Sequence, residues 1–486
     1  MAIKKIDFSY LLIGATFFIY VLTRAIKVGA TYDEVFTIEE LCSFSFFKIL
    51  FLTAVANNHV VNTVLIKLLF LTGSDSLFIA RLPNLVALIG YLYFGYKIAS
   101  RNLSPAIGLG CFTLLVCNPF LLEFFGLARG YGLSLAFMMG SVYFASENVK
   151  SFSHSTFSRS LIFGALSVFT VYSMLYFWVA LAIILNTAVL LKENRVTFKN
   201  AIRHSFYIGS VLAFFISLPL IRMIIHKKLY YGGHTSFYED TLISLTQYTL
   251  YHPGVTTLTY TSLNLFLAAT TAITLAAWVR KKQVNSCSKL FISLAILPAL
   301  LIITAHHLTG TLYPIDRVAL FFYPLLILPL CFSLNEIRKK VSIPILLAFT
   351  FGLSFNLISN SNLYKTELWP FDAHSEKILQ ILNKQGEKEG KVVNLQIDWF
   401  FQPSIEYYLK RGRYPFIQII DPLSSAINPE AGYYLFLSGK ATDYISELRE
   451  ERGLEVEELC RIQEFLKYPE EQVVVFDLKK RTHTQL

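Results

Sequence analysis

Two adjacent carboxylates, Asp33 and Glu34, lie just past the end of the first long apolar segment of the chain. Neighbouring acids repel each other, and a lipid bilayer close by raises the cost of their charges further. A carboxylate in such a place is suited to accept a proton from an attacking hydroxyl group. The pair therefore predicts a general base at the membrane face, and the alternative is a solvated loop with two ordinary acids.

Further polar residues occur in segments that we expect at the same membrane face. They are Asn58, His59, Glu123, Arg129, Tyr131 and Arg317, with Arg81 near the start of an apolar segment. Arginine is suited to bind a phosphate because its planar fork of N–H groups matches the phosphate oxygens. Two acids, a histidine and two arginines at one level of the membrane predict a site for an anionic lipid headgroup.

Several of these residues also have a plain structural explanation. His59 alone would be an ordinary interfacial histidine, and Arg81 could simply extend its charge toward water. Arg317 has Asp316 beside it, and a local ion pair of this kind contributes little to stability. These alternatives stay open on the sequence alone.

The segment 226–240 combines histidines with acids, but their spacing matches no tight zinc pattern. We expect no metal site there. The segment is equally consistent with a loop that closes over a substrate, in which Gly232 and Gly233 provide the flexible point.

The composition is that of a membrane protein with several spans. Of the 486 residues, 54% are hydrophobic and only 16% charged, and the mean hydropathy is +0.51. The net charge of +10 belongs to cytoplasmic loops in this interpretation, because no basic run with interleaved aromatic residues predicts binding to nucleic acid. The six cysteines form no CxxC pair and show no metal-ligand spacing.

Eleven apolar segments are long enough to cross a bilayer, which needs about 20 residues per helix. They cover residues 8–26, 77–98, 104–122, 130–147, 160–175, 176–192, 205–225, 256–278, 288–306, 317–334 and 341–359. Basic residues gather in alternate connections, for example from Arg338 to Lys340, and such residues mark the cytoplasmic side. We expect a mainly α-helical bundle of about eleven transmembrane helices, with the N-terminus inside and the C-terminus outside.

The first outer loop and the tail depart from this pattern. The loop at 27–76 is too long for a simple connector, and its apolar stretch Val60–Phe70 predicts a helix on the membrane surface. A twelfth span is the alternative, but it would invert every later loop. We place the transmembrane domain at 1–360 and a small α/β domain outside the membrane at 361–486, because strand and helix patterns alternate there. The strand patterns are 392–397, 433–437 and 473–476, and the helical patterns are 374–389, 403–410 and 443–452.

The order of these motifs resembles the polytopic GT-C glycosyltransferases over roughly residues 1–360. The nearest group is the protein O-mannosyltransferases and lipid A aminoarabinose transferases, which resemble glycosyltransferase family 39. Its first-loop Asp-Glu motif is matched by Asp33-Glu34, and its Ala-Arg-x-Tyr motif by Ala128-Arg129-Gly130-Tyr131. Its His-Pro-Pro-Leu-Tyr-like motif is matched only by His59, without the prolines, and Leu127 stands where many relatives have an acid.

The resemblance implies an inverting transfer of a sugar from a polyprenyl-phosphate donor to an acceptor hydroxyl on the outer face of the cytoplasmic membrane. The expected base is Asp33, with Glu34 orienting it or holding the sugar. The implied phosphate ligands are Arg317, Arg129 and Arg81, and the implied substrate contacts are His59, Tyr131, Asn58 and Glu123. No cofactor is implied, although some GT-C relatives use divalent ions. The acceptor is a protein, a lipid or a glycan, and a second catalytic acid is not assigned.

Two other classes of protein remain as alternatives. A transporter or flippase of lipid-linked sugars would need charges within the membrane or paired, interrupted helices. A non-catalytic assembly protein would depend on the tail and would not need Asp33 and Glu34.

Overall fold

A computed structural model of the protein describes residues 5–252, 254–280, 285–420, 431–437, 463–468 and 473–477. The chain divides into two units. The first consists of residues 1–26 and 41–361, and the second of residues 27–40 and 362–486. The short segment 27–40, which carries Asp33 and Glu34, therefore belongs with the tail rather than with the long helices.

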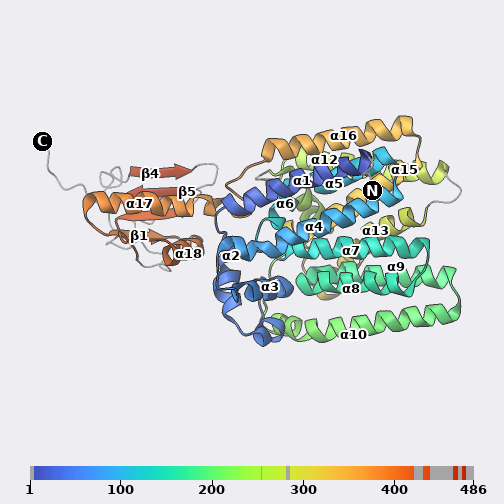
Figure 1. Ribbon diagram of the computed structural model, residues 1–486, viewed down its shortest axis with the longest axis horizontal. Coiled ribbons are helices and arrows are strands. Elements are labelled where there is room, and N and C mark those ends of the chain that lie inside the picture. Colours follow the sequence, from blue (N-terminus) through green and yellow to red (C-terminus); the bar gives the residue numbers. More distant parts are fainter. Residues whose placement is uncertain are drawn as a thin grey trace. The chain divides into compact units, whose positions relative to one another are not determined.

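The first unit consists of helices, and its long helices run side by side (Figure 1). They are α1 (Lys5–Lys27), η2 (Leu41–Ser43), η3 (Lys48–Leu52), α3 (Val60–Phe70), α4 (Leu77–Asn102), α5 (Pro105–Val116), α6 (Pro119–Phe125), α7 (Tyr131–Lys150), α8 (His154–Thr170), η4 (Tyr172–Met174), α9 (Leu175–Lys192), α10 (Arg195–Ile225), η5 (Phe237–Ile243), α11 (Ser244–Leu250), α12 (Thr257–Arg280), α13 (Ser286–Thr309), α14 (Asp316–Ala319), α15 (Phe322–Glu336) and α16 (Lys339–Asn360).

Eight stretches of helix in the described residues are long and apolar enough to cross a membrane, and the bent pair α5–α6 would make nine. The chain is therefore an integral membrane protein with a mainly helical bundle, as the sequence predicts. The stretch formed by α14 and α15 is the most enclosed of the eight. Of the 18 residues that make it apolar enough to cross a membrane, 83% are buried, against 17–44% for the other seven stretches.

The predicted count of eleven spans is not confirmed. The expected span at 104–122 is broken where Asn118 precedes Pro119, and α5 and α6 meet at a bend of 69°. Proline cannot donate the backbone hydrogen bond that would continue α5. The Asn118 side chain instead accepts a hydrogen bond from the backbone N–H of Leu121 at 3.0 Å and caps α6.

Helices α7 and α8 occupy the positions predicted for two further spans, at 130–147 and 160–175. Helix α7 mixes its apolar residues with glycine and serine and ends in polar residues, and α8 has only 17 residues. Neither is therefore counted among the helices that are long and apolar enough to cross a bilayer on their own. The helix predicted at Val60–Phe70 is present as α3.

The second unit is a small α/β structure. It contains α2 (Tyr32–Val35), η1 (Phe36–Glu40), η6 (Pro370–His374), α17 (Ser375–Glu389), β1 (Val393–Ile397), α18 (Gln402–Arg411), β2 (Ile417–Ile419), β3 (Tyr433–Leu437), β4 (Gln463–Tyr468) and β5 (Val473–Asp477). The strands form one sheet in the order β2-β1-β3-β5-β4, in which β1 is parallel to β2 and β3, and β5 is antiparallel to β3 and β4.

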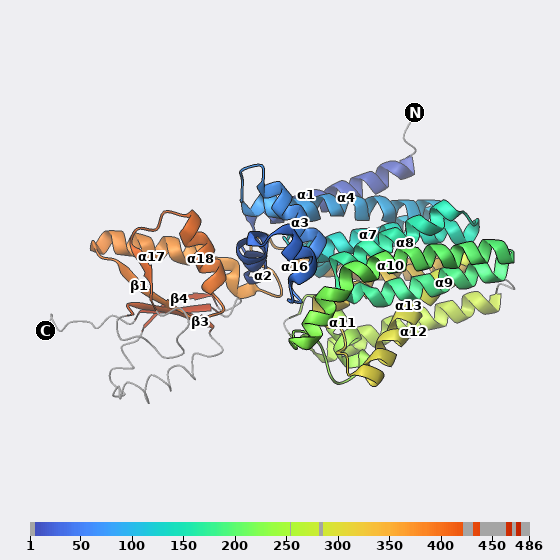
Figure 2. The ribbon, with the colours of Figure 1, turned by 90° about the horizontal axis from the view of Figure 1, so that it is seen from below.

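Helices α17 and α18 lie along this sheet (Figure 2) and contribute to its core. Ile378, Leu382 and Ile405 from the helices pack with Leu395 and Leu435 from the strands. The predicted helices at 374–389 and 403–410 and the three predicted strands are present. Strands β2 and β4 were not expected, and the helical pattern at 443–452 lies outside the described residues.

Candidate active site

The loop that connects α6 to α7 places Arg129 beside the start of α3. The Arg129 guanidinium is buried, and its Nη2 donates a hydrogen bond to Oδ1 of Asn57 at 2.7 Å. His59 precedes α3, and its ring meets that of Tyr131 edge to face, with 4.6 Å between the ring centroids. Three of the residues predicted from the sequence are thus neighbours in the first unit.

Two buried asparagines hold this loop in place. Asn62 in α3 donates from Nδ2 to the backbone oxygen of Ala128 at 3.1 Å. Asn84 in α4 donates to Oδ1 of Asn62 at 2.8 Å and accepts from the backbone N–H of Leu133 at 2.9 Å. Buried polar groups are costly unless they are paired. This chain of hydrogen bonds therefore fixes the Arg129 backbone relative to α3, α4 and α7.

Gly130 is required between Arg129 and Tyr131. A Cβ atom at this position would lie 2.5 Å from Cβ of His59 and 3.1 Å from a methyl group of Thr170. Such a short carbon–carbon separation is repulsive, so a larger residue would push His59 away from Tyr131. The close approach explains the glycine within the Ala-Arg-x-Tyr motif.

Arg317 lies against Tyr231, which belongs to the segment following α10. Its guanidinium is 4.6 Å from the centre of the Tyr231 ring, and its Nη1 donates to the Tyr231 hydroxyl at 3.1 Å. The hydroxyl in turn donates to the carboxylate of Asp316. Burial raises the pKa of Tyr231, and the Asp316 charge adds to this effect, so the phenol keeps its proton.

Asp316 adopts an uncommon backbone conformation, with φ of +37°. Its backbone N–H donates to Oγ of Ser244 at 2.8 Å, which helps to hold this conformation. Residues with positive φ other than glycine are strained and tend to occur at functional sites. The turn before α15 is therefore shaped by Ser244, Tyr231 and Asp316 so that Arg317 is fixed.

Tyr131 and Arg317 line the same small cavity, which has a volume of about 10 Å³. Ser134 and Ser173 add hydroxyl groups to its wall. The cavity has room for about one water molecule in this structure. It lies between Tyr131, which follows the Arg129 loop, and the Arg317 turn. We call His59, Arg129, Tyr131 and Arg317 together the arginine region, because the charges of both arginines act on His59.

His59 in this region is neutral. Burial lowers its pKa well below the usual range, and the positive charges of Arg129 and Arg317 act in the same direction, against a hydrogen bond with the Thr170 backbone. Within the described part of the chain, Nε2 of His59 has no hydrogen-bond partner. A neutral imidazole with one free nitrogen can bond a hydroxyl group of a ligand.

The remaining predicted residues of the first unit are buried and engaged elsewhere. Asn58 donates to the backbone oxygen of Ile49 at 3.0 Å, and Arg81 donates to that of Ala25 at 3.0 Å. Oε1 of Glu123 accepts from Arg24 Nη2 and from the Tyr251 hydroxyl, both at 2.6 Å. Asn58 stays next to His59, since the Thr63 hydroxyl lies within hydrogen-bond distance of both Oδ1 of Asn58 and the backbone oxygen of His59, each at 3.2 Å. The predicted roles of Asn58, Arg81 and Glu123 remain predictions.

Asp33 and Glu34 form the first turn of α2 in the second unit. Oε2 of Glu34 accepts from the backbone N–H of Thr31 at 3.2 Å and from its hydroxyl at 3.1 Å, which closes a capping box. The Tyr408 hydroxyl also binds the backbone N–H of Ala30 at 2.8 Å. The acidic segment is thus anchored to the α/β unit.

A third carboxylate, Asp372, lies beside the acidic pair. Its Oδ2 accepts a hydrogen bond from the backbone N–H of Tyr32 at 2.6 Å. Burial raises the pKa of Asp372 to about 8, and the charges of Glu34 and Asp33 act in the same direction, against hydrogen bonds from Ser404 and Tyr32. Asp372 therefore carries a proton at neutral pH and spares the cluster a third negative charge.

Replacing Asp372 with asparagine should remove a pH dependence of stability. The pKa of about 8 in the folded chain exceeds the value of about 3.9 in the unfolded chain, so the folded state binds more protons between about pH 4 and 8. Wild-type stability should therefore fall as the pH rises through this range. Asp372→Asn should raise the free energy of unfolding by about 4–5 kcal/mol at about pH 7–8 and flatten the slope, as measured by unfolding at a series of pH values.

Replacement of the exposed Glu376 with glutamine provides the control and should keep the wild-type slope. Equal slopes for wild type and Asp372→Asn would show that the pKa of Asp372 is not raised in the folded chain.

In the part of the chain that the structure describes, no group of three or more His, Cys, Asp or Glu side chains is placed to hold a metal ion. Sequence reasoning missed Tyr231, Asn62, Asn84 and Asp372. Of these four, only Tyr231 lies in a segment that the sequence marks as functional, namely 226–240, which could close over a substrate. The others act through contacts between distant segments.

Comparison of the sequence with protein-family models and with curated proteins gave no match. Comparison of the structure with solved structures did. ArnT from Cupriavidus metallidurans in the apo state aligns with a TM-score of 0.55 and 8% identity, covering 96% of this chain and 97% of that chain. ArnT bound to undecaprenyl phosphate aligns with a TM-score of 0.53 and 8% identity, covering 97% of this chain and 98% of that chain.

The Archaeoglobus fulgidus oligosaccharyltransferase aligns less well, with a TM-score of 0.46, 10% identity and coverage of 94% of this chain and 72% of that chain. The two ArnT alignments confirm the resemblance predicted from the motifs at the level of the fold, and they extend over nearly the whole chain. This protein has the fold of the GT-C membrane glycosyltransferases.

Proposed function

We propose that this protein is an inverting glycosyltransferase that moves a sugar from a polyprenyl-phosphate donor to the hydroxyl group of an acceptor. The fold supports the class of enzyme, because ArnT, which shares it, has been crystallised with undecaprenyl phosphate. The observation that carries the proposal is the pairing of Arg129 and Arg317 around a neutral, buried His59 in the helical unit.

The chemical step has one bond forming and one breaking. The acceptor oxygen attacks the anomeric carbon while the bond from that carbon to the phosphate oxygen breaks, so the configuration inverts. The proton of the acceptor hydroxyl passes to the carboxylate of Asp33. The electron pair of the broken bond leaves with the polyprenyl phosphate, which is already a good leaving group.

The arginines supply the electrostatic part of this reaction. As the donor bond breaks, negative charge accumulates on the departing phosphate, and fixed guanidinium groups stabilise that charge. Arg129 is held by Asn57, and Arg317 by Tyr231, so neither side chain needs to reorganise. His59 and Tyr131 provide polar contacts for the sugar, and Glu34 fixes α2 through Thr31 so that Asp33 is held in place.

Arg317→Ala should lower kcat/KM for the donor by roughly 10²–10³-fold, because it removes one preorganised donor to the leaving phosphate. Arg317→Lys should recover part of the loss, since it restores the charge but not the planar fork. Initial rates measured against donor concentration test both variants.

Arg338→Ala is the matched control, because this arginine is exposed and lies outside the candidate site. Equal rates for wild type and Arg317→Ala would remove Arg317 from the proposal.

We further propose that the enzyme lies in the cytoplasmic membrane with its N-terminus inside and its C-terminal domain outside. The alternation of basic connections supports this orientation. In this arrangement residues 1–360 form the transmembrane domain and residues 361–486 the domain outside the membrane, with the acidic segment of the first outer loop attached to the latter.

The decisive experiment incubates purified protein with a panel of radiolabelled polyprenyl-phosphate sugars and a membrane extract. Loss of label from one donor identifies the sugar, and the labelled product identifies the acceptor as a protein, a lipid or a glycan. A transporter or flippase would leave the donor chemically intact and only move it across the bilayer. Recovery of every donor unchanged, together with its movement across vesicles, would overturn the proposal.

A further inference from the structure

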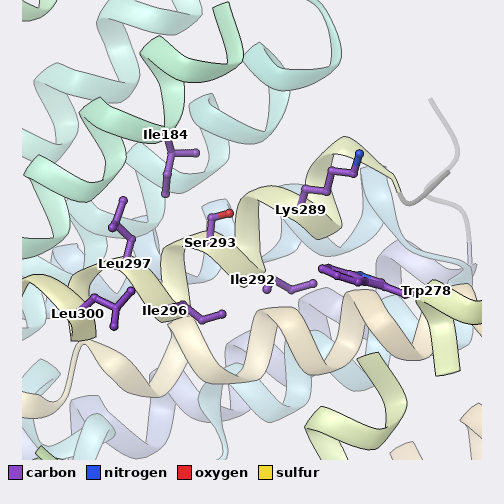
Figure 3. A pocket seen from close by; sticks show the side chains of 8 residues that line it. All are labelled: Ile184, Trp278, Lys289, Ile292, Ser293, Ile296, Leu297 and Leu300. Carbon is purple, nitrogen blue, oxygen red and sulfur yellow. The ribbon is translucent and has the colours of Figure 1, made fainter. Parts of the chain in front are cut away.

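A second cavity in the helical unit shares no lining residue with the small cavity beside Tyr131 and Arg317. It has a volume of about 500 Å³ and lies between α9, α12 and α13 (Figure 3). Trp278 of α12 and Ile184 of α9 border it, and α13 provides the rest of the wall. None of these residues takes part in the proposed transfer reaction.

The wall formed by α13 is a stripe of side chains on one helix face. Lys289, Ser293, Ile296 and Leu300 follow one another at intervals of three or four residues, which places them above one another on a helix. From Lys289 to Leu300 the stripe is about 16 Å long, at about 1.5 Å per residue. This length is close to the thickness of one leaflet, about 15 Å, because the hydrocarbon core of a bilayer is about 30 Å thick.

The apolar part of the stripe is open to the surroundings. Ile296 is 53% exposed, Leu300 51% and Trp278 52%. Because the chain is an integral membrane protein, the material in contact with such side chains is lipid. A groove that is one leaflet long has room for one acyl chain, whereas a polyprenyl chain of greater length would extend beyond it.

The end of the groove carries positive charge. Lys289 is exposed, and among the described residues no acidic side chain pairs with it. One turn before it, Ser286 accepts a hydrogen bond from Nζ of Lys192 at 3.0 Å, so a second lysine lies at this end. Basic pockets between transmembrane helices attract anionic headgroups.

We infer that this cavity binds one anionic phospholipid. The phosphate of the headgroup pairs with Lys289, and one acyl chain lies along α13 as far as Leu300. The site selects a lipid by the charge of its headgroup and by the length of one leaflet. It is separate from the polyprenyl-phosphate donor site, so it stands or fails independently of the proposed function.

Quenching of Trp278 by brominated lipid tests this site, since the ring borders the cavity. The chain has four tryptophans, and replacing Trp178, Trp369 and Trp399 with phenylalanine leaves Trp278 as the only one. This variant is reconstituted in phosphatidylcholine that contains a small fraction of brominated phosphatidylglycerol or brominated phosphatidylcholine. We expect phosphatidylglycerol to be enriched about fivefold at Trp278, from the attraction of one lysine for an anionic headgroup.

Lys289→Gln should reduce the enrichment of phosphatidylglycerol over phosphatidylcholine at Trp278 to about onefold. Lys340→Gln, which changes an exposed lysine on α16, should leave this enrichment unchanged. Equal quenching by the two lipids, or a preference that survives Lys289→Gln, would overturn the inference. Displacement of the brominated phosphatidylglycerol by an equimolar amount of undecaprenyl phosphate would show that the occupant is a polyprenyl phosphate, and would overturn it too.

A measurement on the unmodified chain guards against misfolding of the tryptophan variant. Native mass spectrometry of wild-type protein from an equal mixture of phosphatidylglycerol and phosphatidylcholine should show one retained phosphatidylglycerol per chain. Retention of neither lipid, or of both equally, would contradict the site.

Discussion

Asp33→Asn is expected to lower the rate of sugar transfer by roughly 10²–10⁴-fold while the protein keeps its fold. Asparagine has nearly the shape of aspartate but cannot take a proton from the acceptor hydroxyl. The contact that the residue makes through its backbone, in which its oxygen accepts from the Thr37 hydroxyl at 3.0 Å, does not depend on the side chain. Single-turnover rates at saturating donor measure the loss.

Glu34→Gln is the matched neighbour for this experiment. The glutamine oxygen can still accept from Thr31, so the capping box and the position of α2 should survive. Its effect on the rate should therefore be much smaller than that of Asp33→Asn. Equal losses at the two positions would show that α2 needs its total charge and not a base at Asp33, and an unchanged rate in Asp33→Asn would exclude Asp33 as the base.

Glu123→Leu should lower the free energy of unfolding by about 3–5 kcal/mol, because it leaves the buried Arg24 charge without its carboxylate. Oε1 of Glu123 is 2.6 Å from Nη2 of Arg24, and both side chains are at most 4% exposed. The Tyr251 hydroxyl loses its acceptor as well. Unfolding in a titration with denaturing detergent measures the change.

Two comparisons separate a structural role of Glu123 from the substrate contact predicted from the sequence. The double variant Arg24→Leu/Glu123→Leu should recover much of the stability, since no charge is left buried. Glu147→Gln, which removes an exposed ion pair with Arg101 and Lys150, should cost less than about 1 kcal/mol. If Glu123→Leu instead lowers the transfer rate with no loss of stability, the predicted substrate contact is favoured.

The parts of the fold that could be predicted from the sequence depend on local patterns. Runs of apolar residues predict most of the long helices, and the short run Val60–Phe70 predicts α3 with its exact bounds. These helices are predictable because residues close together in the sequence determine them. Strand β3 was found as a compact apolar run, whereas β2 has only three residues, Ile417–Ile419, too few for a pattern. The break at Pro119 had a visible signal, and the hydropathy of the surrounding residues concealed it.

The candidate site was only partly predictable because its members meet across the sequence. The motif around Arg129 indicated one side of the arginine region. On the other side, the Tyr231 hydroxyl binds Arg317, and these two residues are 86 positions apart in the sequence. The link from Asn84 to Asn62 joins two helices, and no local pattern marks either residue. Likewise, nothing in the tail indicates that Asp372 belongs beside α2.

The hydrogen bond between Tyr32 and Asp372 joins residues that are 340 positions apart. At a synthesis rate of roughly 5–20 residues per second, a ribosome makes Asp372 roughly 20–70 seconds after Tyr32. The Asp33–Glu34 turn therefore leaves the ribosome well before Asp372, whose carboxylate binds the start of α2. Under the proposed function, a nascent chain that has made only the first helices still lacks the contact that holds the proposed base in place, so sugar transfer has to wait until Asp372 has been made.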